Sequence, residues 1–229
     1  MPATITKYKI GTSNPSIGHD PGAGMWNSKP KTMKMNMLKT EIIEHLPFAY
    51  PVIGDDAVKH MYHYFANSGI DYTIDLQDMV HDVPDAKKMY ENEVEKAKRF
   101  VQTLPVGMHN ITTDTTVGGY NDKLQNWNWY YAVGGYCAWI KGVAKIEQDK
   151  SGKRMYRMDY EYKVADRYNW DTGKQVEIFG ITITDQFMGE FHRQGLAKEF
   201  NMYGSIKASI EWDSLNPNNH TVVSSTSGR

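Results

Sequence analysis

The sequence of 229 residues contains a single cysteine, Cys137, which excludes an intramolecular disulfide framework. Such a composition is typical of synthesis in a reducing compartment. Long apolar runs are also missing: the longest nearly uncharged one, from Tyr130 to Ile140, is about half of the ~20 residues that a membrane-spanning helix needs. The first residues, MPATITKYKIG, lack the apolar run and small-residue cleavage site of a secretory signal. We therefore expect neither a spanning helix nor a Sec-type signal peptide.

The signature motifs of several enzyme classes are absent as well. The sequence has no G-x-x-x-x-G-K-[ST], no G-x-S-x-G, no H-E-x-x-H and no C-x-x-C. His60 and His63 stand three residues apart and could share a metal ion, but the sequence around them offers no recognisable further ligands. We accordingly expect no metal site and no cofactor.

Net charge is close to zero, at −1, so the whole molecule has no electrostatic bias toward nucleic acid. The charge is nevertheless uneven along the chain. Residues 1–40 hold six lysines and one carboxylate, Asp20, so this stretch carries +5 and the remainder −6. A basic N-terminal stretch thus precedes an acidic body, and no nucleic-acid partner is expected.

Composition divides the chain into three parts. Residues 1–32 are rich in glycine and proline, which predicts a flexible basic arm. Residues 33–215 are predicted to form a single domain, and residues 216–229, rich in asparagine, serine and threonine, a disordered tail. Within the domain, helices come first and strands follow with one late helix. This order predicts an α+β fold in which a helical N-terminal half packs on an antiparallel β-sheet.

Periodicity places the individual elements. Helical spacing predicts a short helix that ends near Pro47, a second from Asp55 to the region before Gly69, and a third from about Asp85 to Thr103. From residue 110 the apolar period changes from 3.6 to 2. Strands are predicted over Tyr136–Gln148, Tyr156–Val164 and Ile206–Trp212. The first two are expected to form a hairpin through QDKSGK, and VEIFGITIT predicts a further hairpin about Gly180.

The stretch 181–200, ITITDQFMGEFHRQGLAKEF, contains the late helix, from Asp185 to Gln194. Thr184 can cap its first amides and Gly195 can end it. His192 and Arg193 lie near its C-terminus, where the helix dipole favours a protonated histidine in a capping and salt-bridging role. The alternative is catalytic: His192 and Arg193 could face Asp166, Tyr168 or Asp171 across a groove, as an acid, a base and an anion clamp for phosphoryl chemistry.

Large aromatic side chains are concentrated in WNWYYAVGGYCAWIKG. Core packing is one explanation of this density. The other is a surface that contacts a membrane interface or a partner protein, because tyrosine and tryptophan combine an apolar body with a polar tip. Trp170, beside a predicted turn, has the same two interpretations. The residues predicted for such a contact surface are Trp127, Trp129, Tyr130, Tyr131, Trp139 and Trp170.

The segments DRYNWDTGK and GITITDQFMGEFHRQGLAKEF resemble a segment of small bacterial toxin domains, which occur as type VI secretion effectors or at the C-termini of polymorphic toxins. The resemblance implies an antibacterial toxin that is made in the cytoplasm and delivered by a secretion apparatus into the envelope of a competing cell. It also implies a cognate immunity protein as partner.

Three functions follow from these observations. The first, suited to a toxin without enzyme motifs, is membrane permeabilisation or pore formation, with the alternating strands or the aromatic run 127–139 contacting the target-cell membrane. The second is an envelope-directed hydrolase similar to colicin M-like lipid II phosphatases, which combine Asp, Tyr, Asp and a His-Arg pair; here these are Asp166, Tyr168, Asp171, His192 and Arg193, with a longer gap before His-Arg. The third is a non-toxic binding or adaptor domain.

Overall fold

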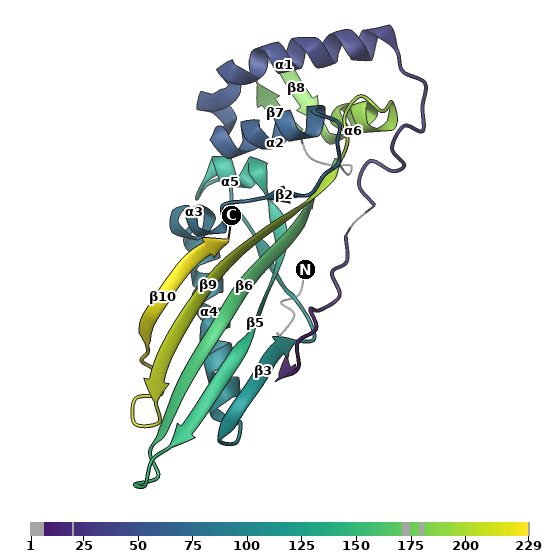
Figure 1. The fold of residues 1–229 in the computed structure, drawn as a ribbon. Helices are drawn as coiled ribbons and strands as arrows, with labels where there is room; N and C mark the ends of the chain where they lie inside the picture. Colours follow the sequence, from purple (N-terminus) through teal and green to yellow (C-terminus); the bar gives the residue numbers. More distant parts are fainter. Residues whose placement is uncertain (1–6, 20, 171–174, 179–180, 229) are drawn as a thin grey trace.

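The computed structural model describes residues 7–19, 21–170, 175–178 and 181–228. It confirms the α+β class: helices pack on a mixed sheet of eight strands (Figure 1). The sheet consists of β1 (Tyr8–Ile10), β2 (Tyr72–Thr73), β3 (Gly107–Thr113), β4 (Val117–Tyr120), β5 (Gly135–Gln148), β6 (Arg154–Tyr168), β9 (Phe200–Asp213) and β10 (Thr221–Gly228). The helices are α1 (Met33–Ile53), α2 (Asp55–Phe65), α3 (Leu76–Asp82), α4 (Pro84–Gln102), α5 (Trp127–Ala132) and α6 (Asp185–Arg193).

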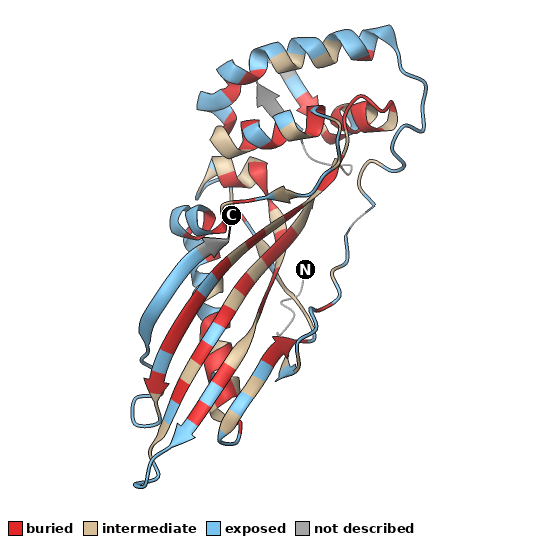
Figure 2. Cartoon of the chain, viewed as in Figure 1, coloured by how far each residue is buried: buried red, intermediate tan, exposed pale blue. Residues whose placement is uncertain are grey.

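The long antiparallel strands β5, β6 and β9 form the centre of the sheet, whose order is β1-β3-β5-β6-β9-β10, with β4 beside β5 and β2 parallel to β9. The predicted alternation is confirmed here, since Tyr156 is opposite Ile146 on one side and Trp212 on the other, and all three are buried. Strand β6 buries one face along its length, and Figure 2 shows this as alternating red and paler bands. The buried face follows from side chains of a strand pointing alternately to opposite faces.

Helices α3 and α4 cover one face of this sheet (Figure 1). The hydroxyl groups of Tyr90 on α4 and Tyr160 on β6 are 2.7 Å apart and share a hydrogen bond at this interface. Helix α4 agrees with the prediction for residues 85–103, including the proline at its first turn. Helix α3, which packs beside α4, was not predicted; it follows the short strand β2.

The remaining helices and the hairpin of β7 (Gln175–Ile178) and β8 (Ile181–Thr184) gather at one end of the sheet (Figure 1). Antiparallel pairing of β7 and β8 agrees with the hairpin prediction, while Gly180 lies outside the described residues. Helix α1 is longer than predicted, because it continues through Pro47 and Pro51. Each proline removes one helical N–H donor, and burial of Leu46, Ala49 and Ile53 offsets that loss.

Both ends of the chain are more ordered than the composition predicted. Strand β1 pairs with β3 inside the region expected to be a flexible arm, and residues 21–32 are bonded to α6. Strand β10 pairs with β9 in the region expected to be a disordered tail. Backbone hydrogen bonds make most of these contacts, so the polar composition of these segments does not prevent their order.

Candidate functional site

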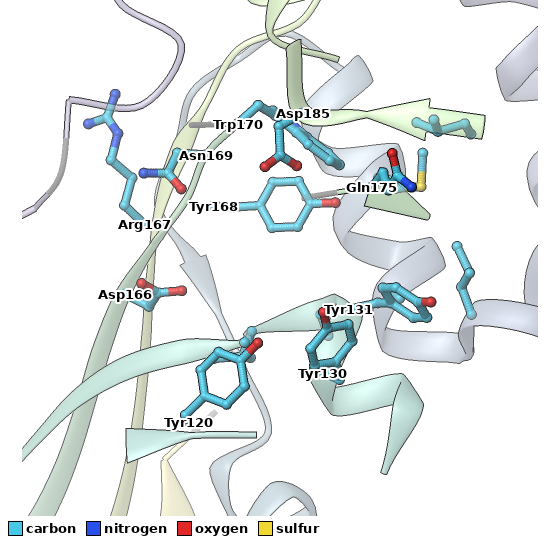
Figure 3. A pocket seen from close by; sticks show the side chains of 17 residues that line it. Tyr120, Tyr130, Tyr131, Asp166, Arg167, Tyr168, Asn169, Trp170, Gln175 and Asp185 are labelled. Atoms are coloured by element: carbon cyan, nitrogen blue, oxygen red, sulfur yellow. The ribbon is translucent and has the colours of Figure 1, made fainter. Parts of the chain in front are cut away.

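A cavity of about 110 Å³ lies where β6 ends and α6 begins (Figure 3). Pockets for drug-sized ligands usually have volumes of about 300–1,000 Å³, so this one suits a small polar group or one end of a larger molecule. We call it the carboxylate–tyrosine cavity, after the side chains that line it. Its polar and aromatic lining consists of Tyr120, Tyr130, Tyr131, Asp166, Arg167, Tyr168, Asn169, Trp170, Gln175 and Asp185.

Two carboxylates and one phenol reach the cavity from different elements. Asp166 and Tyr168 are two residues apart on β6, so they lie on the same face of the strand. Asp185 is the first residue of α6, which begins there because the Thr184 hydroxyl accepts a hydrogen bond of 3.1 Å from the Phe187 amide. Figure 3 shows the Asp185 carboxylate next to the Tyr168 ring. The fold therefore joins residues that are far apart in sequence.

The phenol of Tyr168 is held in its neutral form. Burial, and secondarily the negative charge of Asp185, raise the pKa of Tyr168 well above its usual range. The ring stacks on Phe200 at a centroid distance of 5.0 Å and meets Trp170 edge-on at 5.5 Å. At neutral pH this hydroxyl is therefore a proton donor in a fixed position, and it is not a base.

Tyrosines of β4 and α5 form the opposite wall of the cavity (Figure 3). The rings of Tyr120 and Tyr130 meet edge-on at 6.0 Å, and those of Tyr130 and Tyr131 at 5.0 Å. Burial and a hydrogen bond with its neighbour Tyr130 raise the pKa of Tyr120 to about 12. The wall thus offers hydroxyl groups and ring faces, which suit the polar and apolar parts of a bound molecule.

His192 and Arg193 do not reach this cavity. They occupy the last turn of α6, about 12 Å along the helix from Asp185. The Nδ1 atom of His192 accepts a hydrogen bond of 3.1 Å from the Glu199 amide, and Nε2 is 3.0 Å from the Gly24 carbonyl oxygen, to which it donates. An accepting Nδ1 requires a neutral ring, and burial lowers the pKa of His192. The predicted protonated histidine is therefore wrong.

The carboxylate of Glu199 forms a second polar cluster, with His192 and Arg167, beneath residues 21–32. Its Oε1 atom accepts hydrogen bonds from the amides of Ala23 at 2.8 Å and Trp170 at 3.0 Å, and Oε2 is 3.4 Å from Arg167 Nη2. Glu199 is only 3% exposed. No pattern in the sequence distinguishes this residue, since it is a lone glutamate after a helix. The cluster ties three chain segments together.

Of the five residues predicted for a hydrolase, the structure thus brings Asp166 and Tyr168 together. It adds Asp185, which the sequence analysis treated only as the start of a helix. His192 and Arg193 lie at the other end of that helix, bonded to residues 23 and 24. Asp171 lies outside the described residues.

The residues predicted to contact a membrane lie in several environments. Trp129 and Trp139 are each 1% exposed and belong to the core. Tyr130, Tyr131 and Trp170 are half-buried and line the cavity, whereas Trp127 is 40% exposed. The apolar faces of β6 and β9, the other predicted membrane surface, are buried in the core. None of the helices in the described part of the chain combines the length and apolar character needed to cross a bilayer.

The histidine pair on α2 is engaged in packing. His60 is 1% exposed, with Nδ1 2.8 Å from the Ala132 carbonyl oxygen, and burial lowers its pKa to about 4. His63 Nε2 is 2.7 Å from the Ile70 carbonyl oxygen. Within the described residues, no three His, Cys, Asp or Glu side chains are grouped so that they could hold a metal ion.

Comparison with known proteins gives little. No protein-family model matches the sequence, and no curated protein is significantly similar to it. The crystal structure of pectocin M2, a bacteriocin, matches at 12% identity and a TM-score of 0.28, over 80% of this chain and 62% of that one. The chain therefore spans less than two thirds of pectocin M2, and a TM-score this low does not establish a common fold.

Proposed function

We propose that this chain is an antibacterial toxin that acts on the envelope of a target cell as a hydrolase, with its active site in the carboxylate–tyrosine cavity. The resemblance of residues 166–174 and 180–200 to effector toxin domains supports the toxin role. One structural observation carries the hydrolase: Asp166, Tyr168 and Asp185, two carboxylates and a neutral phenol, line one small cavity. Hydrolytic enzymes commonly use paired acid and base groups of this kind.

In the proposed reaction, a water oxygen attacks the electrophilic atom of an ester while one carboxylate, Asp166 or Asp185, accepts a proton from that water. The bond to the leaving oxygen breaks, and the leaving oxygen takes the proton of the Tyr168 hydroxyl. Tyr168 then recovers a proton from the carboxyl group, so the catalyst is unchanged. An envelope phosphoester is the substrate class that the colicin M-like resemblance implies.

Burial favours this function over membrane permeabilisation. The apolar side chains of β6 and β9 that would have to enter a bilayer form the protein core, among them Tyr162, Ile206 and Ile210, each at most 4% exposed. Exposing them would cost roughly 1.5–3 kcal/mol for each large side chain before any contact with lipid is made. The cavity needs no such rearrangement to receive a small group.

The test is expression in the periplasm of a susceptible bacterium, combined with an assay of phosphate release from an envelope lipid extract. The wild-type chain is expected to arrest growth and release phosphate, and Asp185→Asn and Tyr168→Phe to lower the rate of release by roughly 10²–10⁴-fold. Asp78→Asn, which removes an exposed carboxylate of α3, is the matched control. Growth arrest by Asp185→Asn, together with dye leakage from liposomes, would support permeabilisation in place of hydrolysis.

The same proposal includes the biological setting. The producing cell would hold the toxin in its cytoplasm until a secretion apparatus delivers it, and an immunity protein would protect the producer. Co-purification of the chain with the product of a neighbouring gene, and loss of toxicity when the two are expressed together, would support this setting.

A further inference from the structure

Four exposed large apolar side chains lie close together in sequence, just before α1 and in its first two turns. Met25 is 76% exposed, Trp26 40%, Met33 81% and Met37 66%. Met33 and Met37 are one helical turn apart and share a face, whereas Met35 points the opposite way and is 7% exposed. Figure 2 shows the outer side of this part of α1 as mainly exposed. Single exposed apolar residues are ordinary, but four within thirteen positions are a concentration that calls for an explanation, and we refer to them as the patch.

Lysines accompany these four side chains. Lys31 and Lys34 are exposed between them, and the Lys198 ammonium is 4.9 Å from the centre of the Trp26 ring. Lys29 bonds to Glu190, whose carboxylate is also engaged by Arg193. The next carboxylates along α1 are Glu41 and Glu44, one turn or more beyond Met37. The patch therefore combines apolar and basic groups, and acidic groups bound it on one side.

The patch is held rigidly on the body of the protein. Thr32 caps α1 by accepting from the Met35 amide, and its own amide donates to Gln194 Oε1 at 2.9 Å. The Lys39 ammonium donates to the carbonyl oxygens of Phe65 and Leu196 at 2.8 and 2.7 Å. The backbone that carries these side chains is therefore ordered before any partner binds. This lowers the entropy cost of docking.

We propose that Met25, Trp26, Met33 and Met37, with Lys31, Lys34 and Lys198, form a peripheral docking surface for an anionic lipid membrane. Flexible methionines and an amphipathic indole can enter the headgroup region, and lysines around them attract anionic headgroups. The surface is separate from the aromatic residues that sequence analysis selected for membrane contact. It does not depend on the proposed hydrolase, because lipid binding and catalysis involve different residues.

The surface also bears on how a membrane component could reach the cavity. Helix α1 runs from Met33, in the patch, to Ile53, which lines the carboxylate–tyrosine cavity. Those two ends are about 30 Å apart, since an α-helix rises 1.5 Å per residue. If α1 rests along the lipid surface, the cavity lies within one helix length of the docked patch. A membrane-bound substrate could then be presented to it without leaving the interface.

Co-sedimentation with vesicles tests the proposal on the full chain. One set contains phosphatidylglycerol and phosphatidylcholine in equal amounts, and the other phosphatidylcholine alone. We expect binding to the anionic set only, weakened by added salt, with no release of an encapsulated dye. Lys31→Glu/Lys34→Glu and Met33→Asn/Met37→Asn should each weaken vesicle binding by about tenfold or more.

Matched variants elsewhere on the surface provide the controls. Lys87→Glu/Lys88→Glu reverses two exposed charges on α4, and Met108→Asn/Leu124→Asn removes two apolar side chains that are 72% and 95% exposed. Both should bind vesicles like the wild type, and circular dichroism verifies that every variant is folded. The proposal would be overturned by no binding to anionic vesicles, by equal loss in patch and control variants, or by dye release on binding. Capture of a soluble protein by the patch without vesicle binding would overturn it as well.

Discussion

The imidazole of His192 accepts a hydrogen bond of 3.1 Å from the backbone amide of Glu199. Because the other ring nitrogen donates to the Gly24 carbonyl oxygen, both nitrogens of the ring are occupied. The ring is neutral and 2% exposed. It projects from α6 toward residues 21–32 and the start of β9. These hydrogen bonds give a structural role to a residue that the colicin M-like resemblance suggested as catalytic, and the proposed active site lies at the other end of α6.

His192→Gln is therefore expected to keep hydrolytic activity while lowering stability. Loss of the paired hydrogen bonds should reduce the free energy of unfolding by about 1–3 kcal/mol. Asp185→Asn should do the reverse, with a large loss of activity and a small change in stability. Urea unfolding and phosphate release, measured on both variants, separate the two effects. Abolished activity in a fully folded His192→Gln variant would contradict this assignment of roles.

Gly22 is expected to control whether residues 21–32 stay in place. Its φ of +56° favours glycine, and a Cβ atom there would collide with the Glu199 carboxylate. Gly22→Val should therefore detach this segment, at a cost of about 1–3 kcal/mol. Hydrogen exchange would measure this as faster exchange of the Ala23, Asn27 and Lys29 amides, which are bonded to α6 and Glu199.

Gly18→Val is the control for that substitution, because nothing lies within 4 Å of a Cβ atom built at Gly18 and its φ is not in the left-handed region. It should leave exchange in residues 21–32 unchanged. Equal exchange rates in the Gly22 and Gly18 variants would show that the contact with Glu199 does not hold the segment.

Local patterns predicted much of the fold. The alternation from Tyr156 to Val164 marked β6, because a half-buried strand must repeat every second residue. Thr184 marked the start of α6, since its hydroxyl can satisfy a free amide. Helix α5 was not predicted: six residues give less than two turns, and its tryptophans and tyrosines resemble a strand. Asn126, which caps it by accepting from the Trp129 amide, is the local signal that could have identified it.

The site was only partly predictable, for a different reason. Asp166 and Tyr168 were predicted from the resemblance to colicin M-like phosphatases, but no pattern in the sequence indicates that Asp185 will lie beside them, because tertiary packing brings the two elements together. The contacts of residues 21–32 with α6 and Glu199 were likewise not predictable from the sequence. The Ala23 amide and Gly24 carbonyl make them, and backbone groups are the same in every residue type.

Acid should destabilise the protein through His60. In the unfolded chain a histidine has a pKa near 6.5, while burial lowers that of His60 to about 4. Between these values the unfolded state binds more protons, so stability falls as pH falls from about 6.5 to 4 and then levels off, by up to about 3 kcal/mol. Urea unfolding across this range measures the slope, which should be smaller in His60→Leu and unchanged in the exposed-site control His45→Gln. Equal slopes in all three proteins would contradict the assignment.

Lys98 should hold the C-terminal segment against α4. Its side chain is fully buried, and the ammonium donates to Glu95 Oε1 at 2.8 Å and to the Asn218 carbonyl oxygen at 3.3 Å, with His220 Nδ1 at 3.2 Å. Lys98→Met keeps the packing volume but removes these donors, so we expect faster hydrogen exchange in β10 with little change in β5 and β6. Global stability should fall only modestly, because Glu95 is 36% exposed and water can solvate it.

Lys88→Met, at an exposed position of the same helix, is the control for this last variant. It should leave exchange in β10 at the wild-type rate. If Lys98→Met also left that rate unchanged, β10 would be held by its pairing with β9 alone, and the buried ammonium would have no part in ordering the segment that composition predicted to be disordered. Faster exchange confined to Lys98→Met would instead assign that order to one buried charge and the backbone carbonyl it binds.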